Sequence, residues 1–189
     1  MKEALRMSLA KRREFLMRER LFSLWDKVEV MDPVTQGVVG HFQRKLLSIR
    51  TQYRLQDPLG AIELIVQQKL LAWRPTYKFF RGNPSGEPDE VGFLGILRRG
   101  FFAFYPHYWF DTPDGTRRFE VNGDFFGLSY DIVEYGRSIG SVSKTFWAIR
   151  DTYGLRIEPT VPDQTALLLL GAVMVIHAIH EKRERRSRG

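Results

Sequence analysis

Two pairs of side chains have the spacing that metal binding or acid–base catalysis requires. His177 and His180 are three residues apart, so on a helix they would face the same side and could bind one metal ion. Only Glu181 stands nearby as a further ligand, and the chain has no cysteine. Asp111 and Asp114 could act as general acid and base, but they belong to an Asp-Thr-Pro-Asp-Gly sequence that is typical of a turn. We therefore expect no metal site, no cofactor and no catalytic residues.

Basic side chains are the remaining candidates for a binding site, because they attract the phosphate groups of lipids and nucleic acids. The formal net charge of the chain is +7, and its excess lies at the two ends. Residues 1–20 carry seven Lys and Arg against three Glu, residues 181–189 carry five against two, and residues 21–180 are neutral. The candidates for contact with an anion or a lipid headgroup are Arg12, Arg13, Arg98, Arg99, Arg117, Arg118 and Lys144.

Residues 1–20 predict a basic N-terminal segment that is partly helical. Leu5, Leu9 and Leu16 can share part of one helical face, and basic side chains surround that face. Such a helix suits an anionic membrane surface, where each Lys or Arg adds about 1 kcal/mol of attraction. A solvated or docking helix with a basic tail is the alternative, because single leucines at these spacings are common.

An apolar tetrad with a small third residue recurs six times along the chain. The copies occupy residues 21–24, 46–49, 70–73, 101–104, 125–128 and 146–149. Several copies are followed by a tyrosine and, two residues later, by an apolar residue, which is the period of a strand with one buried face. Asp, Pro, Asn and Gly then mark a turn before the next strand. Each repeat therefore predicts two strands joined by an apolar corner, and six repeats predict about twelve antiparallel strands.

About twelve strands favour a closed barrel, because closure removes the exposed edges of the sheet. A barrel of that size is too wide for its own side chains to fill. Residues 166–179 are apolar on all sides, and as a helix they would extend about 21 Å, short of a hydrocarbon core of about 30 Å. We therefore predict a mainly β fold in which a core helix at residues 164–181 passes through a barrel formed by residues 21–181. Residues 182–189 are expected to form a basic, flexible tail.

Several segments also resemble one protein family in their order along the chain. They are Arg-Phe-Glu-Val-Asn-Gly-Asp-Phe-Phe at 118–126, Val-Ser-Lys at 142–144 before Trp147, Arg-Asp-Thr-Tyr-Gly at 150–154, Leu-Leu with Arg-Pro-Thr-Tyr at 70–77, and the apolar run at 166–179. Together they resemble the LURP-one-related proteins over roughly residues 15–181. That family resembles the Tubby C-terminal domain and the phospholipid scramblases, which implies a twelve-stranded barrel around a central hydrophobic helix.

The resemblance implies a lipid-binding role more than lipid scrambling. Tubby domains bind phosphoinositide headgroups, and scramblases carry an acidic, calcium-associated segment immediately before the helix. The corresponding residues 151–163 include Arg156 and few carboxylates, whereas calcium requires six to eight oxygen ligands. The resemblance therefore does not extend to a calcium site in this chain.

These observations favour a non-enzymatic binding or scaffold module that attaches peripherally to anionic phospholipid or phosphoinositide membranes. We expect a cytoplasmic monomer with an unidentified protein partner, because the first residues lack the apolar run of a secretory signal. A nucleic-acid-binding module is an alternative suggested by the isoelectric point of about 9.8, although the neutral body makes nucleic acid the less favoured partner. A small-ligand carrier or an enzyme with a site in the barrel is a further alternative, and an open polar cavity would support it.

Overall fold

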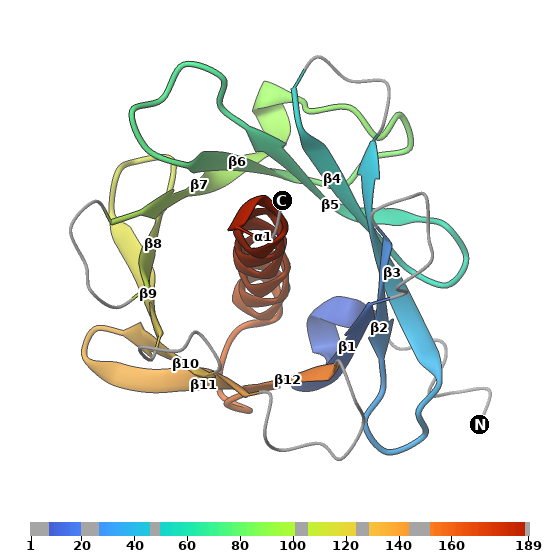
Figure 1. The fold of residues 1–189 in the computed structure, drawn as a ribbon. Helices are drawn as coiled ribbons and strands as arrows, with labels where there is room; N and C mark the ends of the chain where they lie inside the picture. The colour runs from blue at the N-terminus through green and yellow to red at the C-terminus, as the bar shows by residue number, and fades with distance from the viewer. Residues whose placement is uncertain are drawn as a thin grey trace.

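The computed structural model describes most of the chain, namely residues 8–19, 27–45, 50–100, 106–123, 129–143 and 152–187. Within them, twelve antiparallel strands close into a barrel in which each strand pairs with its neighbours in sequence and β1 pairs with β12 (Figure 1). The strands are β1 (Glu14–Glu19), β2 (Lys27–Met31), β3 (Val38–Lys45), β4 (Gln52–Gln56), β5 (Ile62–Gln68), β6 (Thr76–Arg81), β7 (Phe93–Arg99), β8 (His107–Asp111), β9 (Arg117–Gly123), β10 (Ser129–Glu134), β11 (Arg137–Ser143) and β12 (Thr152–Ile157). Helix α1 (Asp163–Ser187) follows the last strand, and two short 3-10 helices are η2 (Leu9–Lys11) and η3 (Glu90–Gly92).

Helix α1 fills the barrel that the strands enclose. Figure 1 looks along the barrel and shows the helix at its centre. Leu64, Phe79 and Phe110 point inward from the strands and are 0% exposed. On the helix, residues 165–176 are buried apart from the half-buried Leu167, so apolar side chains on all sides of α1 face the wall of the barrel. The predicted barrel around a central helix is confirmed.

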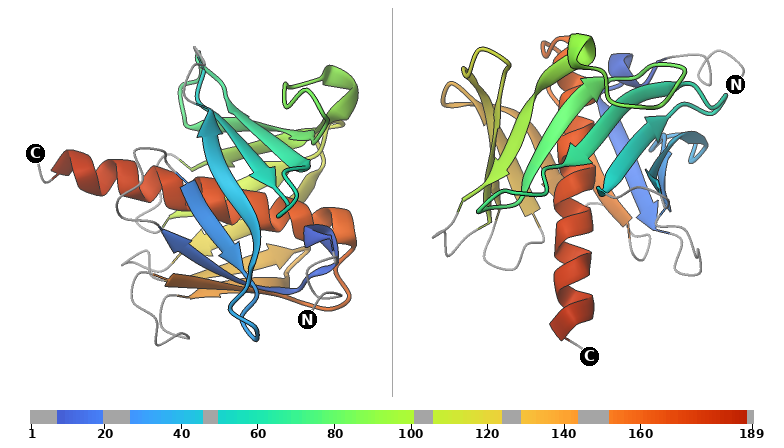
Figure 2. Two further views of the ribbon diagram at one scale, coloured as in Figure 1. Left: turned by 90° about the vertical axis from the view of Figure 1, so that its right-hand side faces the viewer. Right: turned by 90° about the horizontal axis from the view of Figure 1, so that it is seen from above.

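The two ends of the barrel are built from different connections. At one end, which we call the turn end, the strands are joined by residues 32–37, 57–61, 82–92, 112–116 and 135–136. Positive φ angles occur there at Gly60, Gly86, Gly115 and Gly136, as expected for the predicted Gly-containing turns. Because β12 also ends on this side, α1 enters the barrel through the turn end and leaves at the opposite one, which we call the exit end (Figure 2).

The N-terminal segment differs from the sequence-based expectation. Residues 14–19 form barrel strand β1 and not part of an amphipathic helix, and η2 is the only helical piece among residues 8–19. Phe15 and Met17 point into the apolar core, and β1 pairs with both β2 and β12. This strand is needed to close the barrel, so hydrogen bonding along two edges outweighs any helical preference. The barrel therefore begins at Glu14 and not at residue 21.

Helix α1 is longer than the expected core helix. It begins at Asp163 and continues to Ser187, so residues 182–187 belong to the helix and not to a separate tail. Among the described residues, α1 is the one helix long and apolar enough, over Asp163–His180, to cross a membrane by length and composition. However, 67% of that stretch is buried inside the barrel. The burial explains its apolar character without a membrane.

Candidate functional site at the exit end of the barrel

Arg98 and Arg117, two of the predicted anion ligands, are bound to carboxylates of the protein. Both form ion pairs with Asp111, and the distance from Arg117 Nε to Asp111 Oδ1 is 3.0 Å. Arg117 also donates to Glu120 Oε1 at 2.9 Å. This hydrogen bond lowers the pKa of Glu120. The antiparallel register of β7, β8 and β9 thus brings these charges together on the outside of the barrel.

Arg118 and Arg99 also have partners within the protein. The Nε atom of Arg118 lies 3.0 Å from Glu134 Oε1, and the Nη2 atom of Arg118 donates to Thr165 Oγ1 at 3.2 Å. The Arg99 guanidinium lies 6.0 Å from the centre of the Tyr108 ring, at the limit of a cation–π contact. These two arginines are therefore separate from the cluster around Asp111.

Arg12 and Arg13 hold the start of β1 in place. Arg12 is 6% exposed and its Nη1 donates to Asp32 Oδ2 at 2.6 Å. Arg13 Nη2 donates at 2.7 Å to both the Val161 carbonyl and Asp163 Oδ1, which connects β1 to the first residues of α1. Lys144 lies outside the described residues. The six described candidates thus do not form one binding site, and five of them are paired with carboxylates.

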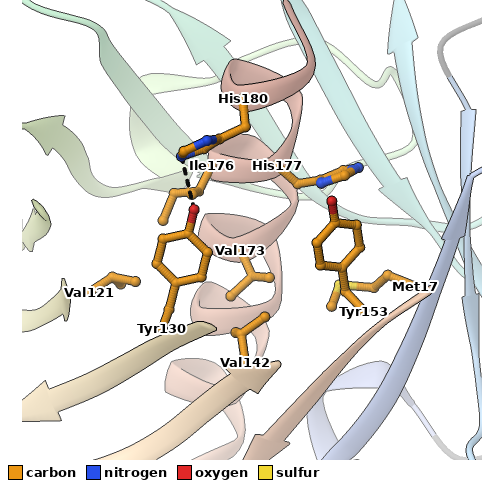
Figure 3. Close-up of a pocket in the computed structure, with 9 residues that line it drawn as sticks. All are labelled: Met17, Val121, Tyr130, Val142, Tyr153, Val173, Ile176, His177 and His180. Atoms are coloured by element: carbon orange, nitrogen blue, oxygen red, sulfur yellow. Dashed lines mark hydrogen bonds between the residues drawn. The ribbon is translucent and has the colours of Figure 1, made fainter. Parts of the chain in front are cut away.

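A small pocket lies at the exit end, where α1 passes the ends of β10 and β12. Tyr130 and Tyr153 point from these strands toward His180 and His177 of the helix (Figure 3). The Tyr130 hydroxyl and His180 Nε2 are 2.9 Å apart and share a hydrogen bond. The rings of Tyr153 and His177 meet edge to face, with centroids 4.3 Å apart. The two histidines are therefore in contact with tyrosines at the rim of the core.

This pocket is small, and its polar groups are the two histidines and the two tyrosines. In the described part of the chain, no group of three or more His, Asp and Glu side chains could hold a metal ion. The remaining lining is mainly apolar, and the free volume is about 20 Å³, which is room for one or two water molecules. Asp114, the other catalytic candidate, accepts hydrogen bonds from Thr112 Oγ1 and the Thr116 N–H, as expected in a turn.

The loop of residues 69–75 carries the largest exposed apolar side chains that the structure describes at the exit end. Leu71 and Trp73 are 92% and 97% exposed, and Leu70 is 55% exposed. The loop is closed at its base by a hydrogen bond of 2.9 Å from the Lys69 N–H to the Thr76 carbonyl. Folded protein leaves such clustered side chains in water only at a cost in free energy, so they indicate an interaction surface.

Sequence reasoning identified this tetrad as an apolar corner but did not predict that its side chains face solvent. The five other tetrads fall outside the described residues. The strand ends next to them, such as Lys27, Lys45 and Gln52, lie at the exit end. The available signal was the alternation of apolar tetrads with polar turns along the sequence, because successive connections of an antiparallel barrel lie at opposite ends and every second connection therefore lies at the same end.

Helix α1 extends the exit end away from the barrel. Residues 177–180 are half-buried, and the backbone of the following turns projects beyond the strands (Figure 2). Residues 181–189 carry five Lys and Arg against two Glu. The exit end therefore combines an exposed apolar loop, a His–Tyr rim and a helix whose last residues are basic in sequence.

Comparison with known proteins identifies the family. The family model described as LURP-one-related matches residues 13–176. An Arabidopsis thaliana protein whose structure was solved by X-ray crystallography has a similar fold, with a TM-score of 0.64, 11% sequence identity, and coverage of 89% of this chain and 92% of that one. No curated protein matches the chain. The match over most of its length, together with the barrel and its central helix, shows that the chain belongs to the LURP-one-related family.

Proposed function

We propose that the protein is a non-enzymatic binding module that attaches peripherally to anionic phospholipid membranes from the cytoplasm. The observation that carries this proposal is the excess positive charge at the C-terminal end of the chain, whereas Arg12, Arg13 and Arg18 near the N-terminus have carboxylate partners. Residues 182–189 hold five Lys and Arg against one Glu, and the helix that bears most of them projects from the barrel (Figure 2). Each such residue near an anionic leaflet adds about 1 kcal/mol of attraction, so a few of them suffice for reversible binding.

The barrel wall is less suited to hold the anion. Arg12, Arg98, Arg117 and Arg118 each have a carboxylate within ion-pair distance, so an approaching phosphate would have to compete with Asp32, Asp111, Glu120 or Glu134. Further cations on the strands are paired in the same way, namely Arg18 with Glu29, Lys45 and Arg54 with Glu87, and Arg156 with Glu14. Attraction that falls with salt is therefore expected mainly from the C-terminal end of the chain.

The two alternatives have less support. A nucleic-acid-binding module needs several cations on one face that are available for phosphates, and the described strand cations named above are mostly paired. A carrier or an enzyme with a site in the barrel needs a cavity, whereas α1 occupies the interior and leaves about 20 Å³ at its rim. Similarity of fold to the Arabidopsis protein carries no function by itself.

Vesicle sedimentation tests the proposal with the intact chain. Vesicles of phosphatidylcholine alone are compared with vesicles that also contain phosphatidylserine or a phosphoinositide, each at low and at high salt. We expect the protein to sediment with the anionic vesicles at low salt, to be released at high salt and to remain in solution with phosphatidylcholine. If the intact chain does not bind anionic vesicles at low salt, the proposal is wrong. A gel shift with duplex DNA and RNA under the same conditions tests the nucleic-acid alternative.

A further inference from the structure

We propose that the exit end of the barrel is the membrane-facing surface and that the 69–75 loop inserts Leu70, Leu71 and Trp73 at the lipid boundary. This inference rests on the proposed function, which it makes more specific by naming the contact surface. The occupant is an anionic lipid bilayer.

The two barrel ends have opposite charge in their described connections. Those at the turn end, together with residues 158–162 before α1, contain seven carboxylates and no Lys or Arg. The seven are Asp32, Asp57, Glu87, Asp89, Glu90, Asp114 and Glu158. Glu87 reaches back along the barrel to pair with Lys45 at the exit-end terminus of β3, which leaves six carboxylates at the turn end. The 69–75 loop contains Lys69 and Arg74 and no carboxylate. Residues 8–13, which lead into β1 at the turn end, add Lys11, Arg12 and Arg13, and two of these three pair with Asp32 and Asp163. The turn end is therefore net acidic and the 69–75 loop net basic, so an anionic bilayer favours contact through the exit end.

The apolar side chains are also distributed differently between the ends. Large exposed apolar residues of the turn end occur singly, one in each of four connections, namely Val34, Leu59, Val91 and Tyr135. In the 69–75 loop, three such residues lie within four positions. Single exposed apolar residues are common on soluble proteins, whereas a cluster indicates a contact surface. Tryptophan next to leucine and basic residues is the composition of an interfacial anchor.

The contacts of the loop suit shallow insertion. The Lys69–Thr76 backbone hydrogen bond and a bond from Thr76 Oγ1 to the Arg74 carbonyl fix its base. The Arg74 guanidinium lies 5.3 Å from the centre of the Trp109 ring, against the outer wall of the barrel. The apolar tip can therefore enter the lipid while its base and the basic side chains stay at the headgroups.

Helix α1 sets the orientation of the barrel on the membrane. From His180 to Ser187 it extends about 10 Å further along its axis. A barrel axis perpendicular to the bilayer would push this basic stretch into hydrocarbon, which is costly. An inclined axis brings the helix end and the 69–75 loop to the same headgroup plane, so both contribute to binding.

Two matched double variants test the orientation. Leu71→Ser with Trp73→Ser alters the exit end, and Leu59→Ser with Val91→Ser alters the turn end, where the two side chains are 93% and 95% exposed. Because all four side chains are exposed, circular dichroism and thermal melting should show both variants folded like the unaltered chain. We expect L71S/W73S to weaken partition into phosphatidylserine vesicles by about tenfold or more, and L59S/V91S to leave it unchanged.

The outcomes separate this inference from the proposed function. If the intact chain fails to bind anionic vesicles, the proposed function is wrong. If it binds and L71S/W73S binds equally well, or L59S/V91S is the weaker binder, the function stands and the exit-end surface is wrong. Light scattering without lipid measures the oligomeric state of the intact chain and of L71S/W73S. If the intact chain is a dimer and L71S/W73S is a monomer, a second copy of the chain covers the loop and the inference is wrong.

Discussion

At the residue scale, Arg12 joins the start of the barrel to its first polar turn. Its guanidinium meets Asp32 Oδ2, while Asp32 Oδ1 accepts hydrogen bonds from the N–H groups of Val34 and Thr35. Burial alone would raise the pKa of Asp32, but the hydrogen bonds from Thr35, Val34 and Arg12 outweigh it, so the pKa lies below its ordinary value of 3.8. The folded state therefore favours the ionised carboxylate.

Asp32→Asn should reduce the free energy of unfolding by about 2 kcal/mol at neutral pH, the scale of a lost hydrogen bond to a charged group. Because the folded pKa is lowered, the contribution of the carboxylate is complete above pH 3.8 and is lost as the pH falls through the folded pKa. The difference between the variant and the unaltered chain should therefore shrink below about pH 4. Urea unfolding of both proteins at neutral and at acidic pH measures this difference in the free energy of unfolding.

Asp57→Asn is the matched control for this prediction. Asp57 Oδ1 accepts hydrogen bonds from the N–H groups of Leu59 and Ala61, much as Asp32 Oδ1 does in its own turn, but no ion pair with arginine is found for it in the described structure. We expect a loss below about 1 kcal/mol for this variant, since an asparagine oxygen can accept the same bonds. Equal losses for both variants would show that the pair with Arg12 contributes nothing.

The partners of the arginines were beyond what the sequence could predict. Arg98 meets Asp111 across 13 positions of sequence, and this contact depends on the register between β7 and β8. A shift of one residue would send both side chains to the other face, and composition does not determine that register. The turn at Asp114 was predictable, because the hydrogen-bond partners of Asp114, Thr112 and Thr116, are only two residues away in the sequence.

At the element scale, strands with clear local signals were easier to predict than β1. The alternating segments after the tetrads, such as residues 53–55 and 77–79, lie in or at the ends of β4 and β6 as expected. Residues 14–19 are short, and their leucine also fits a helical spacing, so local pattern could not decide between strand and helix. Pairing with β12, which is distant in sequence, determines that residues 14–19 form a strand, with Leu16 opposite Gly154.

Helix α1 passes very close to β5 and β6 at Gly171. A Cβ atom there would lie 2.3 Å from Leu64 Cδ2 and 3.1 Å from Phe79 Cε1. Glycine in a helix interior costs about 1 kcal/mol relative to alanine. A side chain larger than glycine would collide with Leu64 of the barrel wall. The glycine therefore allows the close approach of the helix to the wall.

Gly171→Leu should therefore destabilise the protein by about 3 kcal/mol, through overpacking against Leu64. Leu64→Ala alone should cost about 2–5 kcal/mol, because it leaves a cavity in the core. The double variant should be more stable than the sum of the two losses by at least about 1 kcal/mol, since the new side chain fills the space of the old one. Denaturant unfolding of all four proteins gives the coupling, and strict additivity would contradict the contact.

At the scale of the whole molecule, the topology places polar and apolar connections at opposite ends of the barrel. An antiparallel barrel places successive connections at alternating ends, so a sequence that alternates polar turns and apolar tetrads gives one acidic, polar end and an opposite end at which the described 69–75 connection is apolar and exposed. The repeat thus predicted the architecture. The projection of α1 was not predicted, because the apolar run ends at residue 179 whereas the helix continues to Ser187, beyond the strands (Figure 2).

The contributions of the two chain ends to membrane binding can be separated by truncation. The N-terminal cut must stop before Ser8, because Leu9 is 1% exposed and Arg12 is part of the fold. Removal of residues 2–7 takes away two basic residues and one acidic residue, whereas a stop after Glu181 removes five basic residues and one acidic residue. At about 1 kcal/mol for each charge near the surface, the C-terminal truncation should weaken binding to phosphatidylserine vesicles at low salt by at least about tenfold, and the N-terminal one by much less.

The C-terminal truncation should also bind with a weaker salt dependence, because the remaining contact through Leu71 and Trp73 is apolar. Vesicle partition at two ionic strengths measures both effects, and melting curves confirm that the buried part of α1 still fills the barrel. If the N-terminal deletion has the larger effect, the projecting helix is not the main source of attraction.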